Sequence, residues 1–460
     1  MKNKLKVLVI AYIFPPLGGS GVQRTTKFVK YLPQFGWEPL VVCGDNGEVF
    51  GDGYDPTLLA EIPAETKIWR VPFVSPLALR RGVQRRLGIQ PQGGAHTRHE
   101  PSSAGEGSPA QVSPPVSLPR RLANLLALPL HPFEFPPVDA ALYWALSIIP
   151  LCRRIITREK VDVIYTTSFP YSDHVTGLIL KRLTGLPWVA DFRDPWTQNA
   201  SAKNEGWRRA WDQSFERKIL NAANVVIAAT PSYTQGFRQL AKNRPARDFI
   251  TIENGYDEND LLQPDNQLTD HDIKRSTVIA HVGLVYDGTL NPFLNALKQL
   301  DPPATKALMI QFVGGVSQTD RSWIRKNLPD LQCEVIPRVP HQRAIQYMRE
   351  ADVVLLPIGS GQVWQGHYPG KLFEYMASGT PILMLGPDGD AAHLVRESGT
   401  GYFISASDPD EIVHTLRLLA EDLDGFVNRF YRPNWEIISC YERKALTQRL
   451  ASAFNRLVNA

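Results

Sequence analysis

The sequence predicts an α/β protein with two consecutive doubly wound domains, each a parallel sheet between helices, facing each other across a cleft. Its 460 residues exceed what one hydrophobic core comfortably holds. From the amino terminus, short apolar runs alternate with segments of helical periodicity, as in parallel β-α-β units. A second series of the same kind begins at residue 278, after a polar stretch. These observations predict the fold class.

The composition narrows the class of protein. With 43% hydrophobic residues, 21% charged residues and a net charge of +4, the chain is typical of globular proteins. Its basic residues are not interleaved with aromatic ones, so nucleic-acid binding is disfavoured. The four cysteines form no C-x-x-C pair, which favours a reducing compartment over a disulfide or zinc framework. The start M-K-N-K-L-K-V-L-V-I-A-Y is interpreted as a first strand, not a signal peptide, and the apolar run 140–152 is too short to span a bilayer.

The first domain is expected to cover residues 1–260. A strand at 7–11, a helix at 22–35 and a strand at 39–42 form its first β-α-β unit. The loop P-P-L-G-G-S-G between Pro15 and Gly21 follows the first strand, where sheets of this kind bind ligands. It matches neither G-x-G-x-x-G nor a P-loop, so the loop indicates neither a dinucleotide-binding protein nor a nucleoside triphosphatase. A tight turn without a ligand is the alternative.

Residues from about 80 to 120 interrupt this domain. They lose hydrophobic periodicity and are rich in Gly, Pro, Ser and Gln, which predicts a disordered insertion. Arginines flank it on both sides, and an apolar segment follows. Such a segment can dock on anionic lipid headgroups, whereas a solubilising surface loop is the alternative. We therefore expect a cytoplasmic protein, with a peripheral position on the inner face of the cell membrane as a second expectation.

The later part of the first domain contains a dense polar motif. A strand at 188–190 leads into A-D-F-R-D-P-W, which places Asp191, Arg193 and Asp194 at the carboxyl end of a buried strand. This position favours a ligand-binding role, and a buried ion pair between loops is the alternative. The other elements expected here are helices at 140–156, 171–184 and 207–221, strands at 161–166 and 225–229, and a turn in I-E-N-G-Y-D.

The second domain is expected to cover residues 275–432, after a polar linker. Its predicted strands lie at 278–283, 307–313, 333–336, 353–356 and 382–385. Residues 433–460 are expected to form a helix that packs back on the first domain. The stretch H-Y-P-G-K-L-F-E-Y-M-A-S-G-T-P-I combines a Gly loop with a helix start, where unpaired N–H groups suit an anion such as phosphate. A solvated helix start with a Lys371–Glu374 pair is the alternative.

Four motifs together resemble a known family. They are P-P-L-G-G-S-G, A-D-F-R-D-P-W, I-E-N-G-Y-D and P-G-K-L-F-E-Y-M-A-S-G-T-P-I. Their order and spacing are similar to those of the GT-B retaining glycosyltransferases of the family-four type, in a bacterial subgroup, over nearly the whole chain except the insertion. The resemblance implies two Rossmann-like domains and a nucleotide-diphosphate sugar bound mainly by the second.

The resemblance also implies roles for individual residues. Glu374 matches the residue that accepts hydrogen bonds from the ribose diol. The backbone of Gly370, Lys371 and Leu372 matches the diphosphate contact, with added charge from Lys371. The other implied donor contacts are the loops at Gly18, Gly19, Gly283 and Tyr286, and the base-binding segment at Arg338.

Two departures from the family pattern stand out. The position eight residues before Glu374, where many members carry a sugar-binding Glu, is Gly366, with His367 beside it. An Arg and a Lys that many members place near the loop after Gly283 are also missing. We therefore expect the diphosphate charge to be neutralised by Lys371, Arg338 or Arg193.

The implied reaction moves a sugar to a glycan or polyprenyl-linked acceptor hydroxyl with retention at the anomeric carbon. His174, Asp191 and Asp194 are the candidates for contacting the sugar and aligning the acceptor. No cofactor and no metal are expected, because no D-x-D cluster follows a strand. The implied process is cell-envelope or exopolysaccharide synthesis. A nucleotide-sugar 2-epimerase of the same fold and a non-catalytic nucleotide-sugar-binding protein are the alternatives.

Overall fold

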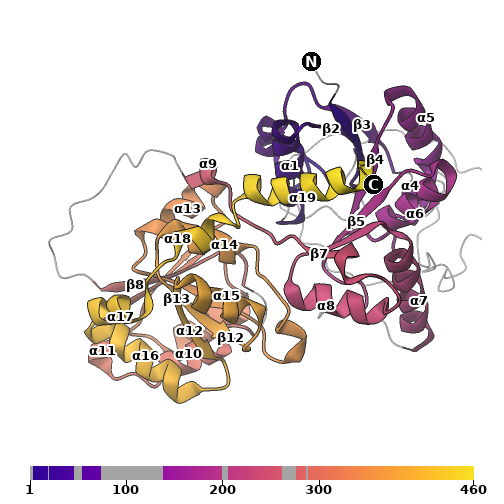
Figure 1. The fold of residues 1–460 in the computed structure, drawn as a ribbon. Coiled ribbons are helices and arrows are strands. Elements are labelled where there is room, and N and C mark those ends of the chain that lie inside the picture. Colours follow the sequence, from indigo (N-terminus) through magenta and orange to yellow (C-terminus); the bar gives the residue numbers. More distant parts are fainter. Residues whose placement is uncertain are drawn as a thin grey trace, which may run out of the picture.

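Two parallel sheets organise the chain, and each reverses its strand order once. The computed structural model describes residues 4–18, 20–45, 54–73, 138–198, 206–261, 276–285 and 288–459. The first sheet has the order β3-β2-β1-β4-β5-β6-β7 and the second has the order β10-β9-β8-β11-β12-β13. Every pairing is parallel. Figure 1 shows the two sheets in separate lobes. The predicted two-domain α/β fold is confirmed.

The first lobe is built from seven strands and the helices that connect them. Its strands are β1 (Leu5–Ile10), β2 (Trp37–Gly44), β3 (Lys67–Val71), β4 (Val163–Thr167), β5 (Trp188–Arg193), β6 (Val225–Ala228) and β7 (Phe249–Thr251). Its helices are α1 (Ser20–Tyr31), α4 (Leu142–Ser147), α5 (Ile149–Glu159), α6 (Ser172–Thr184), α7 (Gly206–Ala222), α8 (Pro231–Leu240) and α9 (Glu258–Leu261), with short turns η1 (Leu32–Phe35), η2 (Pro56–Glu61) and η4 (Ala246–Asp248).

The second lobe repeats this plan with six strands. They are β8 (Thr277–Val282), β9 (Leu308–Val313), β10 (Gln332–Ile336), β11 (Val353–Pro357), β12 (Ile382–Gly386) and β13 (Gly401–Ser405). The helices are α10 (Asn291–Leu297), α11 (Pro302–Lys306), α12 (Gln318–Asn327), α13 (His341–Glu350), α14 (Lys371–Ser378), α15 (Asp390–Ser398), α16 (Pro409–Glu421), α17 (Leu423–Phe430) and α18 (Trp435–Ser439), with a short turn η5 (Gln362–Trp364). The last helix, α19 (Arg443–Val458), packs on the first lobe.

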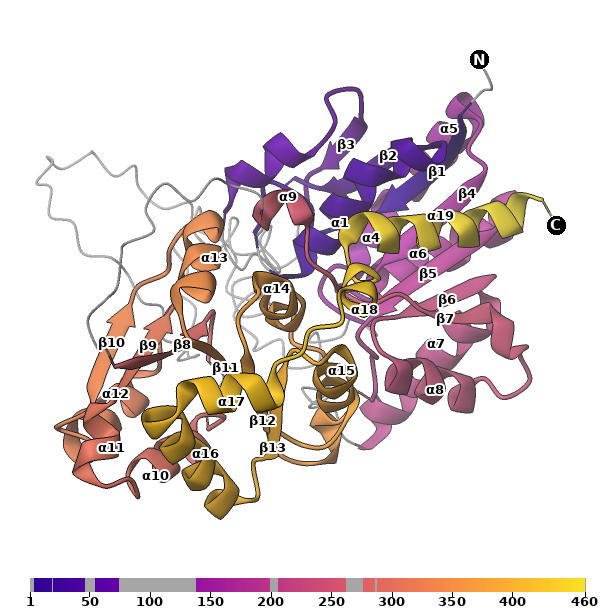
Figure 2. The same cartoon turned by 60° about the vertical axis from the view of Figure 1, so that its left-hand side comes forward.

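Alternate residues of the central strands serve two cores, because successive strand side chains point to opposite faces. In β1, Leu8 and Ile10 pack among residues of α4 to α8, whereas Val7 and Val9 pack among residues of α1 and α19. The helix α19 crosses from the second lobe and lies along the first (Figure 2). Its apolar side chains Leu446, Leu450 and Phe454 join the α1 face of the first sheet. None of the helices in the described ranges is long and apolar enough to cross a bilayer.

Several elements differ from the expectation. The predicted helix at 140–156 is two helices, α4 and α5, which meet at Ile148. Pro150 lies in the first turn of α5; its ring lacks an N–H and would clash inside a continuous helix. Strands β3 and β13 were not predicted, because each lies at a sheet edge and mixes polar with apolar residues. The predicted insertion and most of the predicted linker lie outside the described residues.

Candidate functional site

A cavity opens in the second lobe where the strand order reverses between β8 and β11. Parallel sheets bind ligands at such a point, beyond the carboxyl ends of the strands. The cavity encloses about 300 Å³ of empty space, counting its open mouth. Its walls come from the loops after β8 and β11 and from the start of α14: His281, Leu284, Val285, Thr289, Pro357, Ile358, Gly359, Trp364, His367, Pro369 and Lys371.

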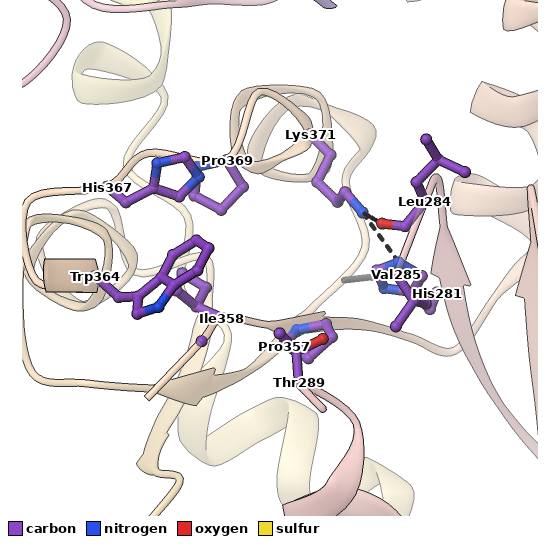
Figure 3. Close-up of a pocket in the computed structure, with 11 residues that line it drawn as sticks. His281, Leu284, Val285, Thr289, Pro357, Ile358, Trp364, His367, Pro369 and Lys371 are labelled. Atoms are coloured by element: carbon purple, nitrogen blue, oxygen red, sulfur yellow. Dashed lines mark hydrogen bonds between the residues drawn. The ribbon is translucent and has the colours of Figure 1, made fainter. Parts of the chain in front are cut away.

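Lys371 supplies the positive charge of this cavity (Figure 3). Its ammonium group donates hydrogen bonds to the Leu284 carbonyl and to Nε2 of His281, both at 3.0 Å. The Nδ1 of His281 lies 3.0 Å from the Leu355 carbonyl, which can only accept. Nδ1 therefore carries the proton, and Nε2 is free to accept from the lysine. One of the three ammonium N–H donors is left for a ligand.

The surroundings shift the pKa of both groups. Burial lowers the pKa of Lys371 to about 8, and the carboxylate of Glu374 opposes part of that shift. Burial and the neighbouring Lys371 charge lower the pKa of His281 to about 3. At neutral pH the cavity therefore holds an ammonium ion beside a neutral imidazole. A buried ammonium ion lacks the water molecules that would otherwise accept its hydrogen bonds. A phosphate oxygen can accept them instead, so the site suits a phosphate.

Glycine and tyrosine residues hold the lysine in place. Gly283, directly after β8, has φ of +115°, and a Cβ there would lie 3.0 Å from the Lys371 ammonium. Only glycine adopts this backbone easily and leaves room for the amine. The Tyr375 hydroxyl, one turn along α14, accepts from the Val282 N–H at 2.8 Å and donates to the Val282 carbonyl at 3.2 Å. These bonds fix the start of α14 against the end of β8.

The start of α14 offers fewer free donors than expected. The N–H groups of Gly370 and Lys371 have no hydrogen-bond partner among the described residues, and Gly370 has open space around its Cα. The Leu372 N–H donates to the Pro369 carbonyl at 3.0 Å. That donor is used in the turn that opens the helix, and the expected contact of Leu372 with a diphosphate stays a prediction. Two N–H groups at this helix start are thus unpaired among the described residues, not three.

Glu374 lies on another side of α14, next to the start of α13. Its Oε1 is 3.7 Å from Nε2 of His341, which also lies 3.5 Å from a carboxylate oxygen of Asp260. Burial raises the pKa of Glu374, and the hydrogen bond to Asp260 raises the pKa of His341. Arg338 is exposed, three residues before α13. Glu374 and Arg338, which are expected to contact the ribose and the base, thus both lie near α13. Arg338 does not line the cavity with Lys371.

At Gly366, where many family members carry a Glu, side chains of the first lobe occupy the space that a longer side chain would need. A Cβ at Gly366 would lie 3.0 Å from the side chains of Ser232 and Tyr233, at the start of α8. The adjoining α15 is held to the same place, because Asp390 accepts from the Ser232 N–H at 3.0 Å. His367 lines the cavity beside Trp364, with ring centres 5.3 Å apart. Burial lowers the pKa of His367, and the nearby carboxylate of Asp194 opposes that shift.

Asp191 is a structural anchor in this fold. Its carboxylate accepts from Arg24 Nε at 2.8 Å and Nη2 at 3.1 Å, from the Tyr165 hydroxyl at 2.6 Å and from the Arg193 N–H at 3.2 Å. The Asp191 side chain is 0% exposed and that of Arg24 is 1% exposed. Every lone pair of the carboxylate is occupied. The geometry favours the buried ion pair over the ligand-binding role, because no oxygen is left for a substrate.

The neighbouring Arg193 and Asp194 are more accessible. Arg193 has a left-handed backbone, with φ of +51°, and its guanidinium lies against Gly21 at the start of α1. Its Nε donates to Asp194 at 3.1 Å. The Asp194 carboxyl is 35% exposed and influences His367 across the lobes. Gly18 is buried in the loop between β1 and α1. Gly19 and Tyr286 lie outside the described residues.

His174 does not reach any cavity described here. It is fully buried in α6, with Nδ1 2.8 Å from the Thr166 hydroxyl and its ring 4.4 Å from that of Phe192. Burial lowers its pKa to about 3, so the imidazole is neutral. The ring lies inside the first core, and its expected contact with a sugar stays a prediction.

Two residues of the site were missed from the sequence. His281 was not singled out, although it is a lone imidazole near the carboxyl end of the otherwise apolar strand T-V-I-A-H-V. That signal could have been found. Trp364 follows no pattern that points to a cavity, because it lies in the irregular loop before α14. Its place depends on how residues 358–370 fold back on the sheet.

Comparisons with known proteins identify the two domains of this chain. Residues 19–255 match the glycosyl transferase 4-like domain, and residues 276–422 match the glycosyl transferases group 1 domain. No curated protein sequence matches significantly. Among solved structures, sucrose-phosphate synthase from Thermosynechococcus elongatus superposes with a TM-score of 0.62 at 13% identity, covering 98% of this chain and 99% of that one. Anabaena HepE, in complex with UDP and glucose, gives 0.59 at 15%, covering 98% and 99%.

A structure of another class has the same architecture. A putative UDP-N-acetylglucosamine 2-epimerase from Listeria monocytogenes gives a TM-score of 0.52 at 11% identity, covering 98% of this chain and 95% of that one. At such identities the likeness concerns the fold alone. The fold and the matched domains define a GT-B glycosyltransferase. The chain belongs to the glycosyl transferase 4-like family, whose match spans residues 19–255 of its 460 residues.

Proposed function

We propose that this glycosyltransferase moves a sugar from a nucleotide-diphosphate sugar to a hydroxyl of a glycan or polyprenyl-linked acceptor, with retention at the anomeric carbon. The observation that carries the proposal is the Lys371 ammonium in the cavity at the strand-order reversal, beside neutral His281 and the unpaired N–H groups of Gly370 and Lys371. Together they form a site for a diphosphate.

The same groups supply the expected catalysis. When the glycosidic bond to the donor breaks, negative charge grows on the departing diphosphate. An ammonium ion and two N–H dipoles fixed before the reaction stabilise that charge more than they stabilise the bound donor. The proposal therefore assigns leaving-group stabilisation to Lys371 and the start of α14, and it requires neither a metal ion nor a cofactor.

The first lobe is proposed to present the acceptor. Asp194 is a partly exposed carboxylate of the first lobe whose charge acts on His367 in the second, which suits contact with a sugar or acceptor hydroxyl. His367 and Trp364 form the wall of the cavity opposite Lys371, where a donor sugar would lie (Figure 3). The proposed setting is cell-envelope or exopolysaccharide synthesis, with the protein in the cytoplasm.

Ligand-induced stabilisation tests the donor assignment. The full chain is heated with UDP, GDP, ADP and dTDP in turn, and a ligand at a hundred times its Kd should raise stability by about 2.7 kcal/mol. The base that responds selects the nucleotide sugars for turnover assays with polyprenyl-linked saccharides, with and without EDTA. NMR of the product then reports the anomeric configuration. A flat thermal response to all four nucleotides contradicts the proposal.

The 2-epimerase fold gives the proposal its main competitor, because one solved structure of that class has the same architecture. Incubation of the donor without acceptor separates the two functions. An epimerised nucleotide sugar identifies an epimerase, whereas an unchanged donor that reacts only with acceptor present identifies a transferase. Donor binding with no turnover on any acceptor would identify a binding protein.

A further inference from the structure

We propose that the exposed face of α7 is a docking surface for an anionic phospholipid bilayer. This inference goes beyond the proposed reaction and does not depend on it. It starts from two large aromatic side chains with high exposed fractions: Trp207 is 67% exposed and Trp211 is 41% exposed. They lie four residues apart, so they point to the same side of the helix. Tryptophan is enriched where a protein meets the headgroup region of a membrane.

The stripe continues along the helix with a cation. The ring of Trp211 lies 5.5 Å from that of Phe215, and the ammonium of Lys218 lies 5.1 Å from the Phe215 ring. Residues 207, 211, 215 and 218 follow the helical repeat on one side of α7. This side therefore begins with indole rings and ends with a basic group, as expected for an interfacial helix.

The acidic and basic residues of α7 differ in burial. Its exposed charged residues are all basic: Arg209, Arg217 and Lys218. Its two acidic residues, Asp212 and Glu216, are buried. Asp212 pairs with Arg208 at 3.3 Å, and Glu216 accepts from the Trp196 N–H at 2.9 Å. Among the described residues of α7, the exposed charges are thus cations without compensating carboxylates; Lys218 lies on the side of the two tryptophans, whereas Arg209 lies on the opposite side. Lipid phosphates complement such a face, whereas protein interfaces are typically depleted in lysine.

The helix is firmly joined to the first lobe. Ile219 and Leu220 are fully buried in the core, and Glu216 connects α7 to the loop after β5 that carries Asp194. Docking through Trp207 and Trp211 would therefore hold the first lobe at a fixed orientation to the bilayer. That geometry would bring the acceptor lobe to molecules embedded in the membrane.

Vesicle co-sedimentation of the full chain tests the proposal without nucleotide or acceptor. We expect binding to phosphatidylcholine vesicles that contain about 30% phosphatidylglycerol, weaker binding in high salt, and little binding to phosphatidylcholine alone. Two variants, Trp207→Ala/Trp211→Ala and Arg217→Glu/Lys218→Glu, should each weaken the association at least about tenfold. Both should keep the melting temperature and donor binding of the parent chain.

Trp435→Ala is the matched control, because Trp435 is 53% exposed on α18 in the other lobe. It should bind vesicles as the parent does. Equal binding by the parent and both α7 variants overturns the proposal, as does an equal loss in Trp435→Ala or no binding of the parent to anionic vesicles. Because the assay contains no donor, failure here leaves the proposed reaction unaffected, and failure of the donor screen leaves this test valid.

Discussion

The Lys371 ammonium and the unprotonated Nε2 of His281 lie 3.0 Å apart, across the end of β8 and the start of α14. His281 holds its proton on the other nitrogen, against the Leu355 carbonyl. The lysine therefore has a neutral acceptor beside it and, among the described residues, no carboxylate in direct contact. Its charge is positioned but not neutralised, which is what a site for an anionic leaving group requires.

Binding of a nucleoside diphosphate should depend on pH. The pKa of Lys371 is lowered to about 8, so the amine is charged at pH 7 and loses its proton as the pH rises through 8. A diphosphate binds the charged form, so nucleoside diphosphate affinity should be about tenfold weaker at pH 9 than at pH 7. Calorimetric titrations at several pH values measure this. In Lys371→Arg the guanidinium stays charged and the dependence should disappear. A parent chain with equal affinity at both pH values contradicts the assignment.

Asp191 and Asp194 should respond differently to the same substitution. Asp191→Asn leaves the Arg24 charge buried without its partner, so the free energy of unfolding should fall by about 3–5 kcal/mol. Asp194→Asn alters a partly exposed side chain and should change it by less than about 0.5 kcal/mol, while turnover falls about a hundredfold. Urea unfolding and initial rates separate the two effects. Full activity in Asp194→Asn would remove it from the site.

His367 should affect the sugar more than the nucleotide. Its ring nitrogens have no hydrogen-bond partner among the described residues, and it faces the cavity opposite Lys371. His367→Ala should lower kcat/KM for the nucleotide sugar about tenfold or more, since a hydrogen bond made to the sugar is lost. The Kd of the free nucleoside diphosphate should change less than about twofold. His367→Gln, which keeps a donor and an acceptor, should recover part of the rate. A parallel loss of nucleotide affinity would place His367 elsewhere in the site.

Asp257 should hold the end of the first lobe against α1. Its carboxylate, 1% exposed, contacts the Lys27 ammonium at 2.6 Å and the Lys30 ammonium at 3.1 Å, and accepts from the Tyr31 hydroxyl at 2.8 Å. Burial alone would raise its pKa, but the bond and charge of Lys27 lower it far below the ordinary value. Its contribution is thus present above about pH 4 and lost as the pH falls through the lowered pKa.

Asp257→Asn should therefore lower the free energy of unfolding by about 3–5 kcal/mol at pH 7. The gap between variant and parent should narrow below about pH 4, because the unfolded parent chain takes up a proton at Asp257 there while the folded carboxylate stays ionised. Denaturant titrations from pH 7 to pH 3 measure this gap. A gap that does not change with pH would show that the ion pairs contribute nothing to stability.

The sequence predicted the repeated fold because apolar runs such as those in β1, β8 and β12 alternate with amphipathic helices. Local patterns of this kind are set by which face each element buries. Strands β3 and β13 escaped prediction because edge strands mix polar and apolar residues. The break between α4 and α5 was missed although Pro150 signals it, since the apolar residues around it continue in helical period.

The candidate site also has residues that local sequence patterns predict and residues that they do not. The positions of Gly283 and Lys371 follow from local motifs at strand ends and a helix start, and the structure brings them together. The partners of Asp191 and His174 do not follow from local sequence: Arg24 lies 167 positions away from Asp191. The buried network around Asp191 and the contact of Gly366 with α8 arise only when distant elements pack. Residue type and spacing could not separate an anchor from a ligand contact.

The most direct test of the account is equilibrium binding of the nucleoside diphosphate that responds in the thermal screen, compared between the parent chain and Lys371→Ala. Loss of a charged hydrogen bond of about 1.5–3 kcal/mol should raise the Kd by about ten- to a hundredfold at pH 7. The melting temperature without ligand should be retained, because the removed charge is buried and no carboxylate in the described part of the chain contacts it. A Kd that rises less than about threefold would contradict the central claim that Lys371 binds the donor diphosphate.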